Sequence, residues 1–345
     1  MNSNKMRAMK LEDYANLMLP AIEGKLIEAV DWVKNYDSSN LHELLSFHMG
    51  WSGDVDTPVA KGKRIRPLMV TLCTEAAGGD WQNALPAAAG VELIHNFSLI
   101  HDDIEDNSPL RRGRPTLWKK WNVPLAINAG DAMFTLAHMV ALKTENATSV
   151  QVALQAAQLL LKTCLHLTSG QHLDISYEDR DSLELEAYWP MVRGKTAALL
   201  AACTELGPLV AGSELSTRAA YREFGFALGL AFQALDDLLG IWGDSALTGK
   251  STNSDLIARK KSLPILYGLS LEGDFAKRWE KGPVDLDELS EVANLLETEG
   301  ARAYTQNIAD QYTNQALEAL EAAQPESKAG QALQELANQL LKRRA

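Results

Sequence analysis

The chain has 345 residues, 46% of them hydrophobic, and a net charge of −12 from 33 basic and 45 acidic side chains. The acidic balance argues against nucleic acid as the main partner, because phosphate backbones are bound by basic surfaces. Apolar runs are interrupted by charge before they reach the length of a membrane span, so we expect no transmembrane segment.

Apolar residues recur at helical spacing along nearly the whole chain, whereas the alternation typical of strands does not recur. The pattern predicts an all-α fold with helices over residues 11–36, 63–78, 83–106, 122–145, 148–176, 183–211, 215–243, 260–270, 286–297, 299–322 and 328–342. No repeat or low-complexity linker divides the chain, so we expect residues 1–345 to form a single domain.

Local positive charge occurs in two short segments, residues 61–67 and 111–115. Each segment could be a solvated basic turn, or it could bind an anionic small molecule. Composition alone favours the solvated turn for both segments.

The first acidic segment, residues 101–106, ends a helix that is otherwise core-like. Asp102 and Asp106 are four residues apart and Asp103 and Asp106 are three apart, so the three carboxylates share one face of a helix. Negative charge opposes the helix dipole at this end, and a buried carboxylate needs a partner. Mg²⁺, which prefers oxygen ligands, would offset that cost, although a solvated helix end is the alternative.

A second acidic pair, Asp236 and Asp237, ends the apolar stretch over residues 224–235, and Gln233 precedes the pair by less than one turn. A polar triplet at the end of a buried helix usually lines a cavity, and carboxylates there could hold metal from a second side. An ordinary helix end remains the alternative.

Ten short motifs occur in order between about Lys63 and Pro264. They are Gly62-Lys63-Arg64-Ile65-Arg66-Pro67, Glu92-Leu93-Ile94-His95, Asp102-Asp103-x-x-Asp106, Arg111-Arg112-Gly113-Arg114-Pro115-Thr116, Gly170-Gln171-x-x-Asp174, Lys195-Thr196-Ala197, Gln233-x-x-Asp236-Asp237, Gly243-Asp244, Gly249-Lys250 and Lys260-Lys261-Ser262-Leu263-Pro264. On these motifs the chain resembles the trans-isoprenyl diphosphate synthases, the polyprenyl synthetase family that includes farnesyl and geranylgeranyl diphosphate synthases. The resemblance implies an all-α bundle of the isoprenoid synthase type around a central cavity, and condensation of isopentenyl diphosphate with an allylic diphosphate.

The resemblance also implies roles for the residues of these motifs. Isopentenyl diphosphate would be held by Lys63, Arg66, His95 and Arg112, and the allylic substrate (dimethylallyl, geranyl or farnesyl diphosphate) by Arg111, Lys195, Lys250 and Lys260. Thr196 and Gln233 would line the reacting end, with Gln171 and Asp174 contributing dipoles nearby. Asp102 and Asp106 would bind two Mg²⁺ ions and Asp236 a third, and Asp103 and Asp237 would act through waters or neighbouring ligands.

One position departs from the family pattern. Gly240 stands four residues after Asp236, where the family often has a third aspartate. We expect activity to survive, because the first aspartate of that motif is the expected direct ligand and Asp244 lies one further turn along. The change leaves room for an inactive subunit.

Product length in this family is set by residues upstream of the first acidic motif. Phe97 lies five residues before Asp102, about 7.5 Å along a helix, and Ser98 lies one residue closer. This combination resembles the type that stops at the twenty-carbon geranylgeranyl product. Phe97 could instead be ordinary core, with farnesyl diphosphate or a longer chain as the product.

Two other classes of protein remain as alternatives. A class I terpene cyclase shares the helical fold, but would carry an Asn/Ser/Glu triad in place of the second acidic motif, and that triad is absent. A non-catalytic partner subunit of a heteromeric synthase would lose one acidic motif and some basic residues. The family also implies a homodimer.

The remaining histidines and the cysteines suggest no further metal site. The histidines (His42, His48, His138, His166 and His172) lack metal-ligand spacing, so we expect them to be surface or core residues. The three cysteines are odd in number and unclustered, and the N-terminal residues lack the order of a signal peptide. We therefore expect a cytoplasmic protein.

Overall fold

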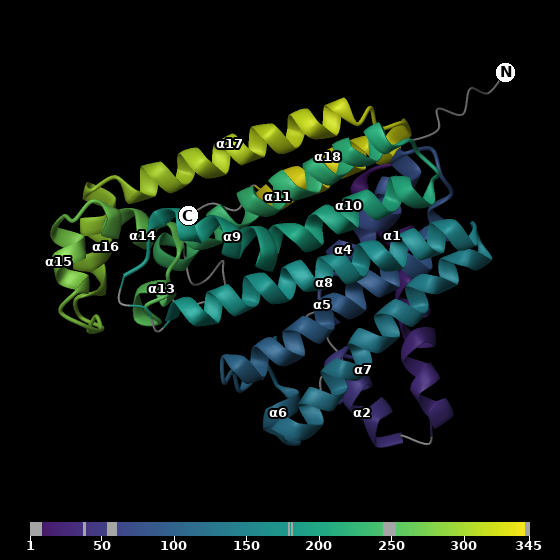
Figure 1. The fold of residues 1–345 in the computed structure, drawn as a ribbon, viewed down its shortest axis with the longest axis horizontal. Helices are drawn as coiled ribbons and strands as arrows, with labels where there is room; N and C mark the ends of the chain where they lie inside the picture. The colour runs from purple at the N-terminus through teal and green to yellow at the C-terminus, as the bar shows by residue number, and fades with distance from the viewer. Residues whose placement is uncertain are drawn as a thin grey trace. The chain divides into compact units, whose positions relative to one another are not determined.

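The computed structural model describes residues 9–36, 39–53, 61–178, 180, 182–243 and 253–341, which are almost entirely helical (Figure 1). The predicted all-α fold is confirmed. The chain divides into two compact units. Unit 1 comprises residues 1–164, 202–219 and 324–333, and unit 2 comprises residues 165–201, 220–323 and 334–345. The single domain expected from the sequence stays a prediction.

Unit 1 is built around α5 and α7, which lie side by side. Its elements are α1 (Leu11–Asp31), η1 (Trp32–Tyr36), α2 (Ser39–His48), α4 (Ile65–Ala76), η2 (Trp81–Ala84), α5 (Leu85–Glu105), β1 (Leu110–Arg111), β2 (Arg114–Pro115), α6 (Leu117–Lys120), α7 (Val123–Leu142), η3 (Lys143–Asn146) and the first part of α8 (Val150–Glu178). Glycine permits the close approach of α5 and α7. A Cβ on Gly90 would lie 2.9 Å from the carbonyl oxygen of Ala137, and one on Gly130 would overlap the imidazole of His101.

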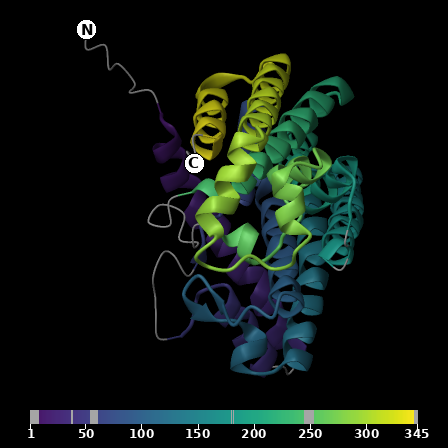
Figure 2. The same cartoon turned by 90° about the vertical axis from the view of Figure 1, so that its left-hand side faces the viewer.

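Unit 2 holds the second group of helices. Its elements are the end of α8, η4 (Leu185–Ala187), α9 (Tyr188–Val192), the π-helical segment η5 (Arg193–Ala197), most of α11 (Leu215–Trp242), α13 (Ser254–Ile257), α14 (Leu263–Ser270), α15 (Asp274–Trp279), α16 (Leu289–Thr298) and α17 (Ala301–Ala322). Helices α10 (Ala198–Val210) and α18 (Ser327–Leu341) contribute to both units. Helices α13 to α16 gather around the N-terminal end of α17 (Figures 1 and 2).

The predicted helix over residues 183–211 is not continuous. It is divided into η4, α9, η5 and α10, and its register changes at the π-helical segment. Apolar periodicity cannot show this change, because the side chains on both sides are equally apolar. The short elements α2, α6, α13, α15 and the β1–β2 hairpin were also not predicted, since a few residues are too short to show a period.

Two helical stretches, Val123–Asn146 and Leu215–Trp242, are long and apolar enough to cross a membrane by length and composition alone. In the most apolar part of each stretch, 44% of the first and 72% of the second is buried inside the protein. Core helices have the same composition, so this is weak support for a membrane span.

Candidate active site

Helix α5 ends directly after its acidic segment. Asn107 adopts a left-handed conformation with φ of 51°, which asparagine tolerates better than most residues. Its amide donates to the carbonyl of Ile104, and the amide of Ser108 donates to that of Asp103. Two of the last helical carbonyls are thereby satisfied, so the carboxylates of the last turn are held on a well-terminated helix.

The carboxylates of this turn differ in their surroundings. Asp103 is only 2% exposed, whereas solvent reaches Asp102 and Asp106. Arg111 donates from Nε to Oδ1 of Asp103 at 2.8 Å and from Nη2 to Oδ2 of Asp102 at 3.2 Å. Burial raises the pKa of Asp103 to about 6, although Arg111 acts in the opposite direction. Of the three aspartates of this turn, Asp102 and Asp106 are therefore more accessible to a ligand than Asp103.

The basic segment after α5 forms a tight hairpin. Strands β1 and β2 pair antiparallel, and the two residues between them, Arg112 and Gly113, have φ of 53° and 74°. Two positive φ values are typical of a type I′ turn, which matches the twist of paired strands. A Cβ on Gly62 would lie 2.7 Å from the guanidinium of Arg112. The glycine of the first basic motif therefore makes room for the arginine of the second.

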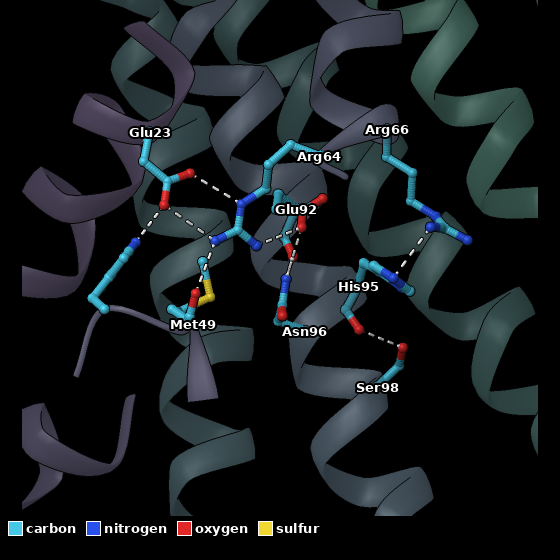
Figure 3. A network of polar contacts seen from close by, with 9 residues as sticks. Glu23, Met49, Arg64, Arg66, Glu92, His95, Asn96 and Ser98 are labelled. Atoms are coloured by element: carbon cyan, nitrogen blue, oxygen red, sulfur yellow. Dashed lines mark hydrogen bonds and ion pairs between the residues drawn. The ribbon is translucent and has the colours of Figure 1, made fainter. Parts of the chain in front are cut away.

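Arg64 is buried and anchors the first basic segment (Figure 3). Its guanidinium donates to Oε1 of Glu92 at 2.9 Å, to Oε2 of Glu23 at 3.0 Å and to the carbonyl of Met49 at 3.1 Å. These acceptors come from α5, from α1 and from the residue that follows α2, so one side chain joins three parts of the chain. Arg64 is therefore committed to holding the scaffold together.

Arg66 faces a different partner, His95 of α5 (Figure 3). Its Nη1 donates to Nε2 of His95 at 3.1 Å, and arginine cannot accept, so this ring nitrogen carries no proton. Burial lowers the pKa of His95 well below its usual value, and the charges of Arg66 and Arg112 lower it further. His95 is therefore neutral in this arrangement.

His48, at the end of α2, lies near the same arginines. Burial lowers its pKa to about 3, with further contributions from Arg112, Arg111 and Arg64. A pocket is lined by His48, Arg111, Arg112 and Asp103, among others. We call Arg66, His95, Arg111, Arg112 and His48 the basic cluster. Like charges disfavour one another in this cluster, and an anionic ligand would relieve that repulsion.

In unit 2, Lys195 and Thr196 lie on the π-helical segment. Close backbone contact with α8 positions this segment. A Cβ on Gly170 would lie 2.6 Å from the carbonyl carbon of Gly194, and one on Gly194 would lie 2.8 Å from the Cα of Gly170. Only glycine at both positions permits this approach. π-Helical turns of this kind are frequent at functional sites.

A chain of hydrogen bonds leads from Thr196 to a buried aspartate. Thr196 Oγ1 donates to Oε1 of Gln233 at 2.7 Å, and Gln233 Nε2 donates to Oδ1 of Asp237 at 2.8 Å. Oδ2 of Asp237 accepts from the hydroxyl of Tyr188 at 2.8 Å and from the amide of Leu263 at 2.9 Å. Burial raises the pKa of Asp237 to about 6. Asp237 therefore holds Tyr188, Gln233 and the backbone of Leu263 in place, and it is not accessible to a ligand.

Two lysines lie among the carboxylates of unit 2. Lys195 Nζ donates to Asp174. Burial acts to lower the pKa of Lys260, but nearby carboxylates outweigh it and the net shift is upward. These carboxylates are Asp237, Asp174, Asp255 and Asp236, of which Asp236 is partly exposed. Lys260 is therefore held in its charged form.

The donor set of the two acidic segments fits Mg²⁺. Within the ranges that the structure describes, no three His, Cys, Asp or Glu side chains form a cage for a metal ion. Mg²⁺ does not need one, because it keeps several waters and binds through one or two carboxylates plus substrate phosphates. Of the aspartates in these segments, Asp102, Asp106 and Asp236 are the ones that solvent reaches.

The remaining predicted residues have varied positions. Lys250 and Asp244 lie outside the described residues. Lys63 is exposed beside Arg64, and Gln171 follows Gly170 on α8. Phe97 packs edge-on against Phe134 of α7, with ring centroids 5.3 Å apart, and Ser98 donates to the carbonyl of His95 at 2.8 Å.

A comparison with known protein families supplies the identification. The sequence profile described as polyprenyl synthetase matches residues 55–296, which is more than half of the chain. The chain belongs to the polyprenyl synthetase family. Within this family it is 40% identical over 316 residues to the (2E,6E)-farnesyl diphosphate synthase of Mycobacterium tuberculosis, covering 89% of this chain and 87% of that one.

Other members of the polyprenyl synthetase family are also similar. The geranylgeranyl diphosphate synthase of Mycobacterium tuberculosis is 38% identical over 287 residues, covering 81% of each chain. The crystal structure of a polyprenyl synthetase from Streptomyces coelicolor A3(2) matches with a TM-score of 0.84 at 36% identity, over 96% of this chain and 98% of that one. A polyprenyl synthase of Caulobacter crescentus, solved with calcium and isoprenyl diphosphate, matches with a TM-score of 0.74 at 28% identity, over 92% and 98% of the two chains. The chain is a prenyltransferase of this family.

Two residues of this polyprenyl synthetase have contacts that the sequence did not indicate. His48, expected to be an ordinary surface or core residue, contributes to the basic cluster. Tyr188, to which no role was assigned, holds Asp237. Both residues are far in sequence from their partners, so spacing within one helix could not reveal them.

Proposed function

We propose that this prenyltransferase is Mg²⁺-dependent, and that it condenses isopentenyl diphosphate with an allylic diphosphate in head-to-tail steps. The observation that carries the proposal is the basic cluster beside the acidic end of α5. Burial and the charges of its arginines lower the pKa values of His95 and His48, and the nearby Asp102 and Asp106 are accessible to solvent. Such a site favours a ligand that brings both anionic oxygens and divalent metal.

The residues of unit 1 would bind and orient isopentenyl diphosphate. Arg66 and Arg112 provide planar donors that suit phosphate oxygens, and Lys63 provides a point charge. His95 accepts from Arg66 in the absence of an anion, so diphosphate binding would favour its protonated form. Arg111 is bound to Asp102 and Asp103, so it would orient these carboxylates as well as contact an allylic diphosphate.

The residues of unit 2 would serve the allylic partner. Lys195, Lys260 and the undescribed Lys250 would contact its diphosphate, with Asp236 as a metal ligand. Bound Mg²⁺ would withdraw electron density from the allylic diphosphate and promote its departure. The hydroxyl hydrogen of Thr196 is committed to Gln233, so the oxygen of Thr196 can present lone pairs to an allylic cation.

We also propose geranylgeranyl diphosphate as the product. Phe97 and Phe134 place two aromatic rings in contact across α5 and α7, upstream of the acidic segment, and this pair would form the floor of the chain-elongation pocket. The similar relatives named as farnesyl and geranylgeranyl synthases are compatible with either product length.

Condensation assays test the reaction and the product together. Purified protein would be incubated with labelled isopentenyl diphosphate, Mg²⁺ and each of dimethylallyl, geranyl and farnesyl diphosphate, and the products sized. We expect the twenty-carbon product, and we expect Phe97→Ala to lengthen it while Phe97→Tyr leaves it unchanged. If no primer is condensed with isopentenyl diphosphate, the proposed prenyltransferase reaction is refuted. A fifteen-carbon product, or an unchanged product with Phe97→Ala, would refute the Phe97 floor.

We further propose a cytoplasmic homodimer. The exposed apolar residues Val150, Leu154, Leu161 and Leu165 are spaced at 4, 7 and 4 residues along α8. That spacing forms one helical stripe, which an identical subunit could cover. All three cysteines are unpaired and buried, which is compatible with a reducing compartment.

A further inference from the structure

Arg114 is the arginine of the β1–β2 hairpin to which no role has been assigned. Arg111 donates to Asp102 and Asp103, and Arg112 belongs to the basic cluster. Arg114 follows on strand β2 and is only 8% exposed. Burial of a charged guanidinium is costly unless it is hydrogen-bonded, so the contacts of Arg114 must offset that cost.

Two backbone carbonyls fix the guanidinium of Arg114. Its Nη1 donates to the carbonyl of Phe47 at 3.0 Å, and its Nη2 donates to the carbonyl of Ser52 at 2.6 Å. Phe47 lies in the last turn of α2, where carbonyls lack partners within the helix and positive charge is favourable. The planar guanidinium suits two separate acceptors, whereas lysine offers one compact ammonium.

The surroundings leave a defined space for this guanidinium. Arg114 Cζ lies over the Phe47 ring, 4.1 Å from its centroid, and Nζ of Lys120 in α6 lies 4.0 Å from the same centroid. A Cβ on Gly53, which has a φ of 111°, would lie 2.8 Å from Nη2 of Arg114. Glycine at this position therefore leaves the space that the guanidinium fills.

The β1–β2 hairpin is thus anchored on both sides of its turn. Arg111 and Arg114 pair across the two strands, and Arg112 and Gly113 lie between them. Arg111 holds its strand to the carboxylates of α5, and Arg114 holds the other strand to the end of α2. The two anchors together set the place of Arg112. Because a diphosphate needs donors at fixed positions, the anchor on α2 affects how well Arg112 can bind one.

We propose that Arg114 is a positioning residue for the diphosphate of isopentenyl diphosphate, and that it acts through Arg112 without touching the substrate. The inference rests on the proposed function, in which Arg112 binds this diphosphate. The allylic diphosphate should depend less on Arg114, because Arg111 keeps its own anchor on Asp102 and Asp103. Loss of Arg114 should therefore affect the two substrates differently.

Two kinds of variant remove the anchor on α2. Arg114→Gln removes the charge and the planar set of donors, and Arg114→Lys removes only the planar set. Lys119→Gln, at an exposed position of α6, removes one positive charge near the hairpin and is the matched control. Gly53→Ala keeps Arg114 but fills its space. Gly212→Ala is the control for backbone strain, because Gly212 also has a positive φ, of 76°, and a Cβ there meets nothing within 4 Å.

Steady-state condensation kinetics on the full chain would measure the KM of isopentenyl diphosphate and of geranyl diphosphate, below the thermal midpoint of each variant. We expect Arg114→Gln, Arg114→Lys and Gly53→Ala to raise the KM of isopentenyl diphosphate by about 10- to 100-fold, because a displacement of about 1 Å has effects of this size. The kcat and the KM of geranyl diphosphate should be unchanged, since the affected diphosphate does not react. Lys119→Gln and Gly212→Ala should match the wild type.

The outcomes separate this inference from the proposed function. A wild type that does not condense the two substrates would overturn the proposed function, and the inference with it. An active wild type and an Arg114→Gln variant with equal KM for isopentenyl diphosphate would overturn the inference alone. An equal rise in both KM values would indicate general damage to unit 1 and would also overturn it. So would an Arg114→Lys variant equal to the wild type, because charge and not the two hydrogen bonds would then be responsible.

Discussion

Asp102 and Asp103 are adjacent in sequence, yet they have different surroundings. Asp103 is buried against Arg111, whereas Asp102 shares the same arginine and is reached by solvent. The helical spacing of Asp102 and Asp106 predicted a shared face. The contact with Arg111 was not predictable, because it depends on the hairpin that follows α5.

Asp102→Asn tests the first acidic segment. We expect kcat to fall by about 10²- to 10³-fold, because removal of one group that stabilises developing charge has effects of this size. The thermal midpoint should change little, since Asp102 is partly exposed. Steady-state kinetics and thermal unfolding check both expectations. Glu105→Gln, an exposed neighbour on the same turn, should retain activity, and equal activity of Asp102→Asn would contradict the metal assignment.

The lowered pKa of His48 predicts that the stability of the protein depends on pH. Its pKa is lowered from 6.5 to about 3 in the folded protein. As the pH falls below 6.5, His48 binds a proton in the unfolded chain but stays unprotonated in the folded protein. The free energy of unfolding therefore decreases between about pH 6.5 and pH 3. The limiting slope is about 1.4 kcal/mol per pH unit.

Urea unfolding of the wild type and His48→Gln at pH 7 and pH 5 measures this effect. The variant should lose less stability between the two pH values than the wild type. His172→Gln, at an exposed position, should behave as the wild type. An identical loss in His48→Gln and the wild type would refute a neutral His48.

At the scale of elements, the π-helical segment depends on two glycines that face each other. Gly170 of α8 and Gly194 bring the two backbones into contact, and Lys195 and Thr196 follow directly. The sequence indicated these residues through their resemblance to family motifs. It could not show the π-helical geometry, because that results from packing against α8.

Gly170→Ala should therefore disturb both stability and activity. The added Cβ would overlap the backbone of Gly194 and Lys195, and overpacking of this kind costs about 1–3 kcal/mol. We expect a lower thermal midpoint and a lower kcat. Gly24→Ala is the matched control, because a Cβ there meets nothing within 4 Å, and it should stabilise α1 by about 0.5–1 kcal/mol. A Gly170→Ala protein as active and stable as the wild type would contradict this role.

At the scale of the molecule, the all-α class and the long helices were predictable because their apolar periodicity extends over many turns. Three features were not predictable: the hairpin at residues 110–115, the division of residues 183–211, and the contact between Gly240 and Asp255. Each depends on partners distant in sequence or on elements of only a few residues. The two-unit division gave no compositional signal, because helices such as α8 contribute to both units.

The exposed stripe on α8 predicts the oligomeric state. Leu154→Glu combined with Leu161→Glu should convert a dimer to a monomer, because two charges would be buried in an apolar interface. Sedimentation velocity would measure the change. Leu286→Glu, at another exposed leucine, should leave the dimer intact. A wild type that sediments as a monomer at all concentrations would refute the homodimer.

Asp237 has a consequence for engineering this enzyme. Its carboxylate receives bonds from Tyr188, Gln233 and Leu263, and through Gln233 it reaches Thr196. A library selected only for heat resistance and a library selected only for turnover should therefore both retain aspartate at this position. Most residues can be varied under one selection without regard to the other, but Asp237 links the two properties in one side chain.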